Sequence, residues 1–138
     1  MESFINWDAL SAISTFVTMI VAGTALYSWK NQEKLKVKLD FKNAVSAYAY
    51  CLMSFPSRLD NPVVRSTFRQ KSQELSDLIA KAGWSWFATE NILIRESEVV
   101  DAWKEINELH GQYLIGQANK ENIIAQCEII ISSHFVFK

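Results

Sequence analysis

The hydrophobic pattern of the chain changes character near residue 30. Residues 9–29 read ALSAISTFVTMIVAGTALYSW and contain no charged residue, no histidine and no proline. At about 1.5 Å per residue, a helix of this segment is roughly 30 Å long, which matches the hydrocarbon core of a bilayer. We therefore predict a transmembrane helix over residues 9–29, preceded by an extracytoplasmic leader of residues 1–8. A helix buried in the core of a soluble protein is the alternative.

The two flanks of this segment differ in charge. Residues 1–8 contain acids but no lysine or arginine, whereas lysines recur over residues 30–42. Because cationic flanks stay in the cytoplasm, the sequence predicts an outside N-terminus and a cytoplasmic helical domain over residues 43–138, at an inner or plasma membrane. The segment 30–42 would be a basic juxtamembrane segment that contacts lipid headgroups, or else a solvated charged face. Its lysines are Lys30, Lys34, Lys36, Lys38 and Lys42.

One face of the predicted span carries small residues. They are spaced by four, four and three positions, at Ser14, Thr18, Ala22 and Ala25. Small side chains let two helices approach closely, and hydroxyl groups can form hydrogen bonds across such a contact. This pattern predicts a homo-oligomer joined through the span. The alternative is that these residues face lipid, with their hydroxyl groups bonded to their own backbone.

Beyond the span, apolar residues recur every three or four positions, which is the helical period. Residues 34–41 alternate charged and apolar side chains, so they fit either a strand or a helix. We expect a helix that continues from the membrane and pauses or bends there. Four helical stretches, with connections at residues 56–61, 83–96 and 116–119, predict an all-α fold in which an antiparallel bundle of about four helices follows the span.

Capping and breaking residues predict where these helices begin and end. Asn61 before Pro62 is a favoured start, and Gly83 is a favoured end of the same helix. Ser97 is expected to cap the next helix, and Gly116 to break it. Two weaker signals are a helical turn over residues 91–94 and an apolar C-terminus, residues 134–138, that packs on the bundle or binds a partner. Finally, Asn119 or Lys120 is expected to begin the last helix.

Composition and charge exclude some functions. The 138 residues have a formal net charge of −1, so we expect no nucleic-acid partner. The two cysteines, Cys51 and Cys127, lie in apolar helical patterns and are expected to be reduced core thiols. There is no GxGxxG, CxxC, HExxH or DxDxDG motif. The sequence therefore predicts no catalytic residue, no cofactor and no metal site, and a protein that is not an enzyme.

Aromatic residues supply the remaining candidate surface. Trp84, Trp86 and Phe87 form the densest aromatic cluster, and Trp103 and His110 follow on the next predicted helix. Together they are a candidate partner surface or pocket. The alternatives are a corner packed at a helix junction and, for His110, a hydrogen-bonded core histidine.

Three functions remain in contention from the sequence. The first is a single-pass, membrane-anchored interaction module that self-associates, or recruits a membrane or cytoplasmic protein at the inner membrane face. The second is a membrane-perturbing effector or small toxin that acts through an oligomer of its span. The third is a small-ligand sensor or enzyme with an aromatic pocket. In each case the lipid bilayer is an expected partner.

Overall fold

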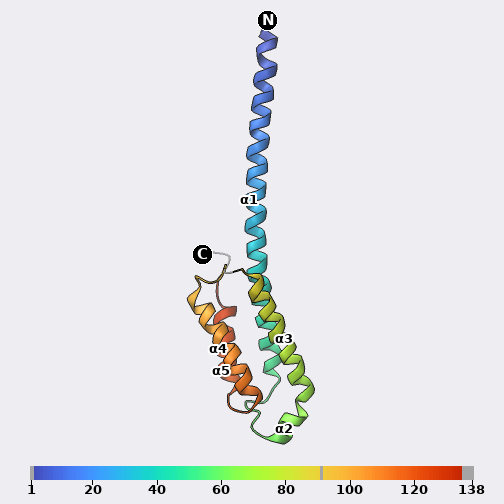
Figure 1. The fold of residues 1–138 in the computed structure, drawn as a ribbon, viewed down its shortest axis with the longest axis vertical. Coiled ribbons are helices and arrows are strands. Elements are labelled where there is room, and N and C mark those ends of the chain that lie inside the picture. The colour runs from blue at the N-terminus through green and yellow to red at the C-terminus, as the bar shows by residue number, and fades with distance from the viewer. Residues whose placement is uncertain (1, 91, 135–138) are drawn as a thin grey trace. The chain divides into compact units, whose positions relative to one another are not determined.

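The computed structural model describes residues 2–90 and 92–134, with side chains from residue 6 onward. The chain forms two compact units, residues 1–34 and residues 35–138. The described residues contain helices and no strand, which confirms the all-α prediction. The helices are α1 (Glu2–Met53), α2 (Pro62–Thr67), α3 (Arg69–Ala88), α4 (Ser97–Leu114) and α5 (Lys120–Ile131) (Figure 1).

The alternating segment 34–41 is part of α1, so the helix expected there is confirmed and it continues through the segment without the expected pause. A helix buries one side of the chain here. Phe41 and, one turn later, Val45 are fully buried, while Lys36 and Asp40 are exposed. The charged positions of the alternation can therefore stay in water without a strand. Burial of the apolar face outweighs the local period-two pattern.

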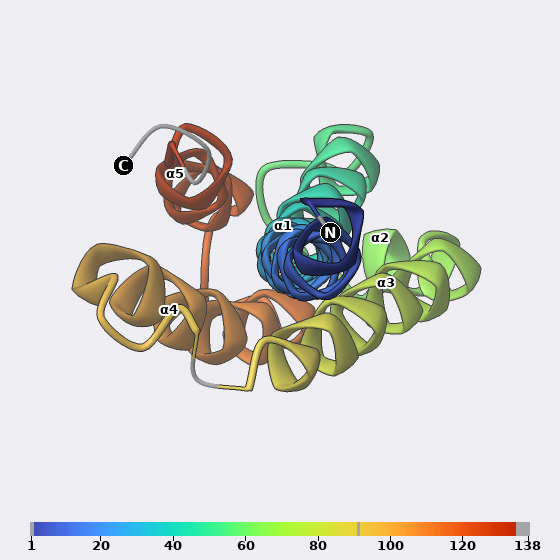
Figure 2. The same ribbon diagram turned by 90° about the horizontal axis from the view of Figure 1, so that it is seen from above.

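Unit 35–138 is built around one core to which the second part of α1, α3, α4 and α5 all contribute (Figure 2). The period of three and four over residues 41–55 is confirmed, because every residue that it marks is buried. These residues are Phe41, Val45, Tyr48, Leu52 and Phe55. The core residues of α4 and α5 follow the same period, at Val99, Trp103, Ile106, Tyr113, Ile123, Cys127 and Ile130. The predicted bundle of about four helices is confirmed.

Hydrogen bonds at both ends fix the relative directions of the helices. At one end, which we call the Phe41 end, Lys42 Nζ donates to the carbonyl of Ser133 after α5 (3.0 Å). At the opposite end, the Tyr113 hydroxyl of α4 donates to the Pro56 carbonyl (2.7 Å). There, Lys120 Nζ of α5 donates to the Phe55 carbonyl (2.6 Å). The second part of α1 and α4 therefore run in the same direction, and α5 runs opposite to both.

The predicted second helix is divided and longer than expected. Asn61 caps it as predicted, because its Oδ1 accepts from the Val63 amide at 2.9 Å. The helix then breaks at Phe68, whose ring packs 5.3 Å from that of Phe55. The predicted end at Gly83 is wrong, since α3 continues to Ala88. Burial of Trp86 one turn later outweighs the helix-interior cost of a glycine, which is about 1 kcal/mol.

The later boundaries are mostly as predicted. Ser97 is the first residue of α4, not its cap; Glu96 holds that position. Gly116 has a φ of 80°, and a Cβ there would lie 2.7 Å from the Leu59 carbonyl oxygen, so a glycine is required. Asn119 precedes α5, as predicted. Of the expected turn at residues 91–94, residues 92–94 form turns and residue 91 lies outside the described residues. Of the apolar C-terminus, residues 135–138 also lie outside them.

Candidate membrane anchor and exposed aromatic surface

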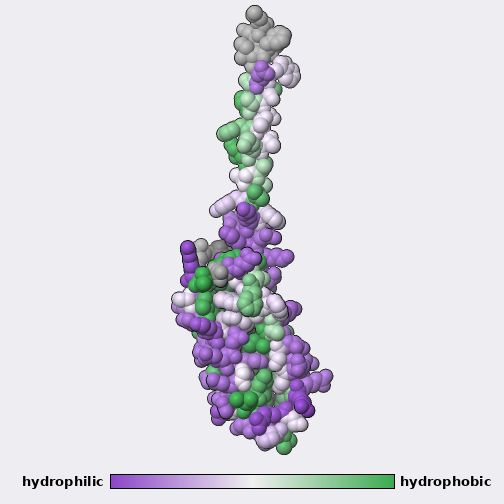
Figure 3. Space-filling view, viewed as in Figure 1, coloured by the Kyte–Doolittle hydropathy of each residue, from purple (hydrophilic) through white to green (hydrophobic). Residues whose placement is uncertain are grey.

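The first unit exposes its apolar side chains. Every described side chain from Asn6 to Lys34 is exposed, including Phe16 at 65%. Among the described residues, α1 is the one helix long and apolar enough to cross a membrane, and none of its apolar window is buried. Figure 3 shows hydrophobic colours on this unit and a mostly hydrophilic surface on the bundle. Within the described residues, this segment is therefore not part of the buried core.

The small-residue face of this segment has its threonine hydroxyl bonded within the helix. Thr18 Oγ1 donates to the Ser14 carbonyl at 2.8 Å. Nearby, Thr15 donates to Ser11 (2.9 Å) and Thr24 to Val21 (3.0 Å) in the same way. A helix in lipid satisfies such hydroxyls internally, and each oxygen can still accept a second bond. The face formed by Ser14, Thr18, Ala22 and Ala25 is therefore suited to close helix packing.

The five lysines fall into two environments. Lys30, Lys34 and Lys36 are exposed, whereas Lys38 and Lys42 are half-buried against the bundle. The bond from Lys42 to the Ser133 carbonyl gives that side chain a structural role at the Phe41 end. The lysine pattern did not predict this role, because the partner is a backbone atom 91 residues away.

The residues of the aromatic cluster lie on two different sides of α3. Trp86 points into the bundle, with its ring 5.1 Å from Phe41 and 6.2 Å from Trp103. Trp103 meets Phe41 edge-on at 5.3 Å. By contrast, Trp84 is 76% exposed and Phe87 is 74% exposed, with ring centroids 6.3 Å apart. The interpretation as a packed corner thus holds for Trp86, while Trp84 and Phe87 form an exposed surface at the end of α3.

His110 lies among hydrogen-bonding partners inside the bundle. Its Nδ1 is 2.9 Å from the Tyr48 hydroxyl, and its Nε2 is 3.5 Å from the Ser76 hydroxyl. Burial lowers the pKa of His110 and raises the pKa of Tyr48 far above its usual range. A neutral imidazole satisfies both contacts, because one ring nitrogen accepts and the other donates. The geometry is that of a hydrogen-bonded core histidine.

This histidine predicts a pH-dependent stability. Unfolded histidine binds a proton near pH 6.5, and folded His110 binds it at lower pH. As the pH falls through that value, the unfolded state takes up the proton first, so the free energy of unfolding decreases. We expect melting temperatures to fall between about pH 7.5 and 5.5, and His110→Gln to flatten this dependence. His134→Gln, at an exposed position, is the control. An unchanged slope in His110→Gln would contradict the assignment.

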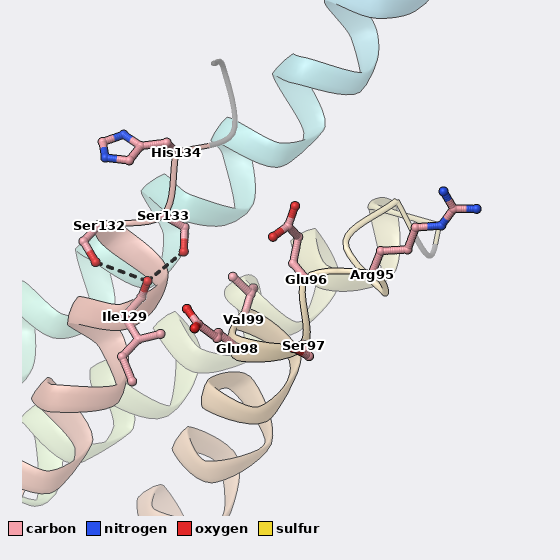
Figure 4. Close-up of a pocket in the computed structure, with 9 residues that line it drawn as sticks. All are labelled: Arg95, Glu96, Ser97, Glu98, Val99, Ile129, Ser132, Ser133 and His134. Atoms are coloured by element: carbon pink, nitrogen blue, oxygen red, sulfur yellow. Dashed lines mark hydrogen bonds between the residues drawn. The ribbon is translucent and has the colours of Figure 1, made fainter. Parts of the chain in front are cut away.

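Two of the predicted pocket residues share a cavity, because Trp86 and Phe87 line one of about 420 Å³ together with Ile94. Trp84, Trp103 and His110 do not line this cavity. One cavity of about 530 Å³ lies between the start of α4 and the end of α5. In Figure 4 its Arg95 side chain points away from the other lining residues, and the hydroxyls of Ser132 and Ser133 donate to the Ile129 carbonyl. Its polar groups therefore do not converge on one point.

In the part of the chain that the structure describes, neither thiol is activated. Cys51 and Cys127 are free thiols; burial raises the pKa of Cys51 and raises that of Cys127 to about 12. A thiol with a raised pKa is a poor nucleophile and a poor metal ligand. Within residues 2–90 and 92–134, no group of three histidine, cysteine or acidic side chains is placed to hold a metal ion.

The chain has no recognisable relative in the comparisons with known proteins. No protein-family model matches it, and neither does any curated protein or solved structure.

Proposed function

We propose that the protein is a single-pass, membrane-anchored interaction module without enzymatic activity. Its N-terminus lies outside, and its helical bundle lies in the cytoplasm. The observation that carries the proposal is the first unit, in which large apolar side chains such as Phe16, Ile13 and Met19 are 60–68% exposed. Apolar surface of this extent needs lipid or another protein to cover it. Aromatic Trp7, Tyr27 and Trp29 at its two ends suit the two membrane interfaces.

The orientation follows from the lysines. Lys30, Lys34 and Lys36 are exposed on the C-terminal side of the apolar segment. Cationic side chains stay on the cytoplasmic side and attract anionic headgroups by about 1 kcal/mol each. The bundle that follows them is therefore assigned to the cytoplasm.

The first partner that we propose is a second copy of the chain. Ser14, Thr18, Ala22 and Ala25 give the span a face on which two helices can approach closely. The Thr18 hydroxyl bonds to its own backbone, so this donor is satisfied when the face enters lipid. The bonds of Thr15, Thr18 and Thr24 weaken the case for a hydroxyl-lined pore, because these three donors are used within the helix. The self-associating module is therefore preferred to the membrane-perturbing effector.

Oligomer mass tests the proposal. We expect the full chain in mild detergent to form an oligomer, and Ala22→Leu to shift it to the monomer, because added bulk separates the helices. Gly23→Leu is the matched control: it places the same leucine side chain on another side of the helix, where nothing lies within 4 Å of an added Cβ. Light scattering during size exclusion gives the mass. A strictly monomeric wild-type chain with no co-purifying protein would refute the proposal.

A further inference from the structure

Three exposed apolar side chains gather at the Phe41 end of the bundle. Trp84 and Phe87 are neighbours on α3, and Phe87 and Ile94 line the same cavity of about 420 Å³. Their exposed fractions are 76%, 74% and 61%. We call Trp84, Phe87 and Ile94 the aromatic patch. Leaving one such side chain in water rather than burying it costs about 1.5–3 kcal/mol, so an occupant that covers the patch is favoured.

We propose that the aromatic patch docks into the headgroup region of the same bilayer that holds the apolar segment. This inference rests on the proposed membrane anchor and deepens it. Docking of the patch would hold the Phe41 end of the bundle against the lipid surface. Tryptophan and phenylalanine suit this place, because the headgroup boundary accommodates an apolar ring body beside polar groups.

The patch is held rigidly at the end of the bundle that the chain reaches first. Trp86, between Trp84 and Phe87 in sequence, packs 5.1 Å from Phe41. Phe41 is the first fully buried residue of the bundle in chain order. The Thr89 hydroxyl donates to the Trp86 carbonyl at 2.6 Å, which closes the turn after α3. The exposed rings are therefore fixed to the bundle rather than carried on a loop.

The connection to the apolar segment is short. Twelve residues lead from Trp29 to Phe41, and α1 is helical over all of them. At about 1.5 Å per residue, this connection is roughly 18 Å long. The Phe41 end therefore stays within that reach of the predicted membrane interface, whatever angle the bundle adopts. A short tether gives the patch a high effective concentration at the lipid surface, so weak docking suffices.

Charges of both signs lie beside the patch. Exposed Lys81 precedes Trp84 by one helical turn, and exposed Arg95 follows Ile94. Acids accompany both: Asp40 lines a cavity with Lys81, Glu96 and Glu98 line one with Arg95, and Glu90 lines the patch cavity. The exposed rings and the short connection therefore support the docking, and net charge does not.

Fluorescence quenching by lipid tests the docking. The full chain is placed at one copy per nanodisc, in mixed zwitterionic and anionic lipids with brominated or ordinary acyl chains. The Trp84 signal is the difference in tryptophan fluorescence between the wild type and Trp84→Phe. This substitution leaves the other tryptophans unchanged. We expect brominated lipid to quench this difference signal by about twofold or more, as for an indole at the acyl boundary.

A second reporter supplies the control. Tyr50 on α1 is 81% exposed, and Tyr50→Trp in the Trp84→Phe background places an indole away from the patch. We expect its emission to be water-like and unquenched. If the Trp84 signal is equally unquenched, the docking proposal is overturned. A blue shift of Trp84 only at two copies per disc would assign the patch to a second copy instead, and also overturn it. The anchor itself is judged separately, from the oligomer mass and from quenching of Trp7 and Trp29.

Discussion

Val17→Arg combined with Ile20→Arg is expected to release the protein from membranes. Both side chains are 51% exposed and lie near the middle of the apolar segment. One arginine at the centre of a membrane helix costs about 2.5–3.5 kcal/mol on insertion scales. Two together would cost about 5–7 kcal/mol if the effects add, which is enough to reverse insertion of a span that contains several hydroxyl groups. The measurement is the share of the protein left in the membrane pellet after alkaline extraction.

The control is an arginine at an exposed apolar position in the bundle. Val63 in α2 is 71% exposed, so Val63→Arg adds one such charge without entering lipid in the proposed arrangement. It should stay in the pellet like the wild type. Retention of the Val17→Arg/Ile20→Arg variant in the pellet would show that the apolar segment is not what holds the protein there.

The helical bundle could be predicted from the sequence because its signals are local. A period of three and four over residues 41–55 depends only on which side chains are apolar, and each marked residue is buried. Asn61 before Pro62 and the glycine at 116 also act within a few residues. Errors arose where a distant contact outweighed a local preference. Gly83 did not end its helix, because Trp86 packs on Phe41, 45 positions earlier (86 − 41).

The candidate site was predictable in composition and not in arrangement. The sequence shows that residues 84–87 are rich in aromatic side chains, but not which of them face the core. That division depends on where α3 meets α1, which is a tertiary contact. Ile94 could not be assigned to the patch, since it joins Phe87 only through the turn after α3. Likewise, the bond of Lys42 to the Ser133 carbonyl has no sequence signal.

Phe41→Ala is expected to destabilise the bundle more than any surface change. Phe41 is fully buried, and its ring contacts both Trp86 and Trp103, at 5.1 and 5.3 Å. Truncation of a buried phenylalanine costs about 3–5 kcal/mol, because it removes apolar contacts and leaves a cavity. For a unit of this size we expect the melting temperature to fall by more than about 10 °C. Near-ultraviolet circular dichroism of the full chain in mild detergent follows the loss of aromatic packing.

Trp84→Ala is the matched control, because it removes a larger side chain that is 76% exposed and lies on the same helix as Trp86. In detergent it should change the free energy of unfolding by no more than about 0.5 kcal/mol. Equal losses in the two variants would mean that Trp84 is packed, which would contradict the exposed patch. A stable Phe41→Ala protein would mean that Trp86 is held by other contacts. The rigid support inferred for the patch depends on the first variant being unstable and the second being stable.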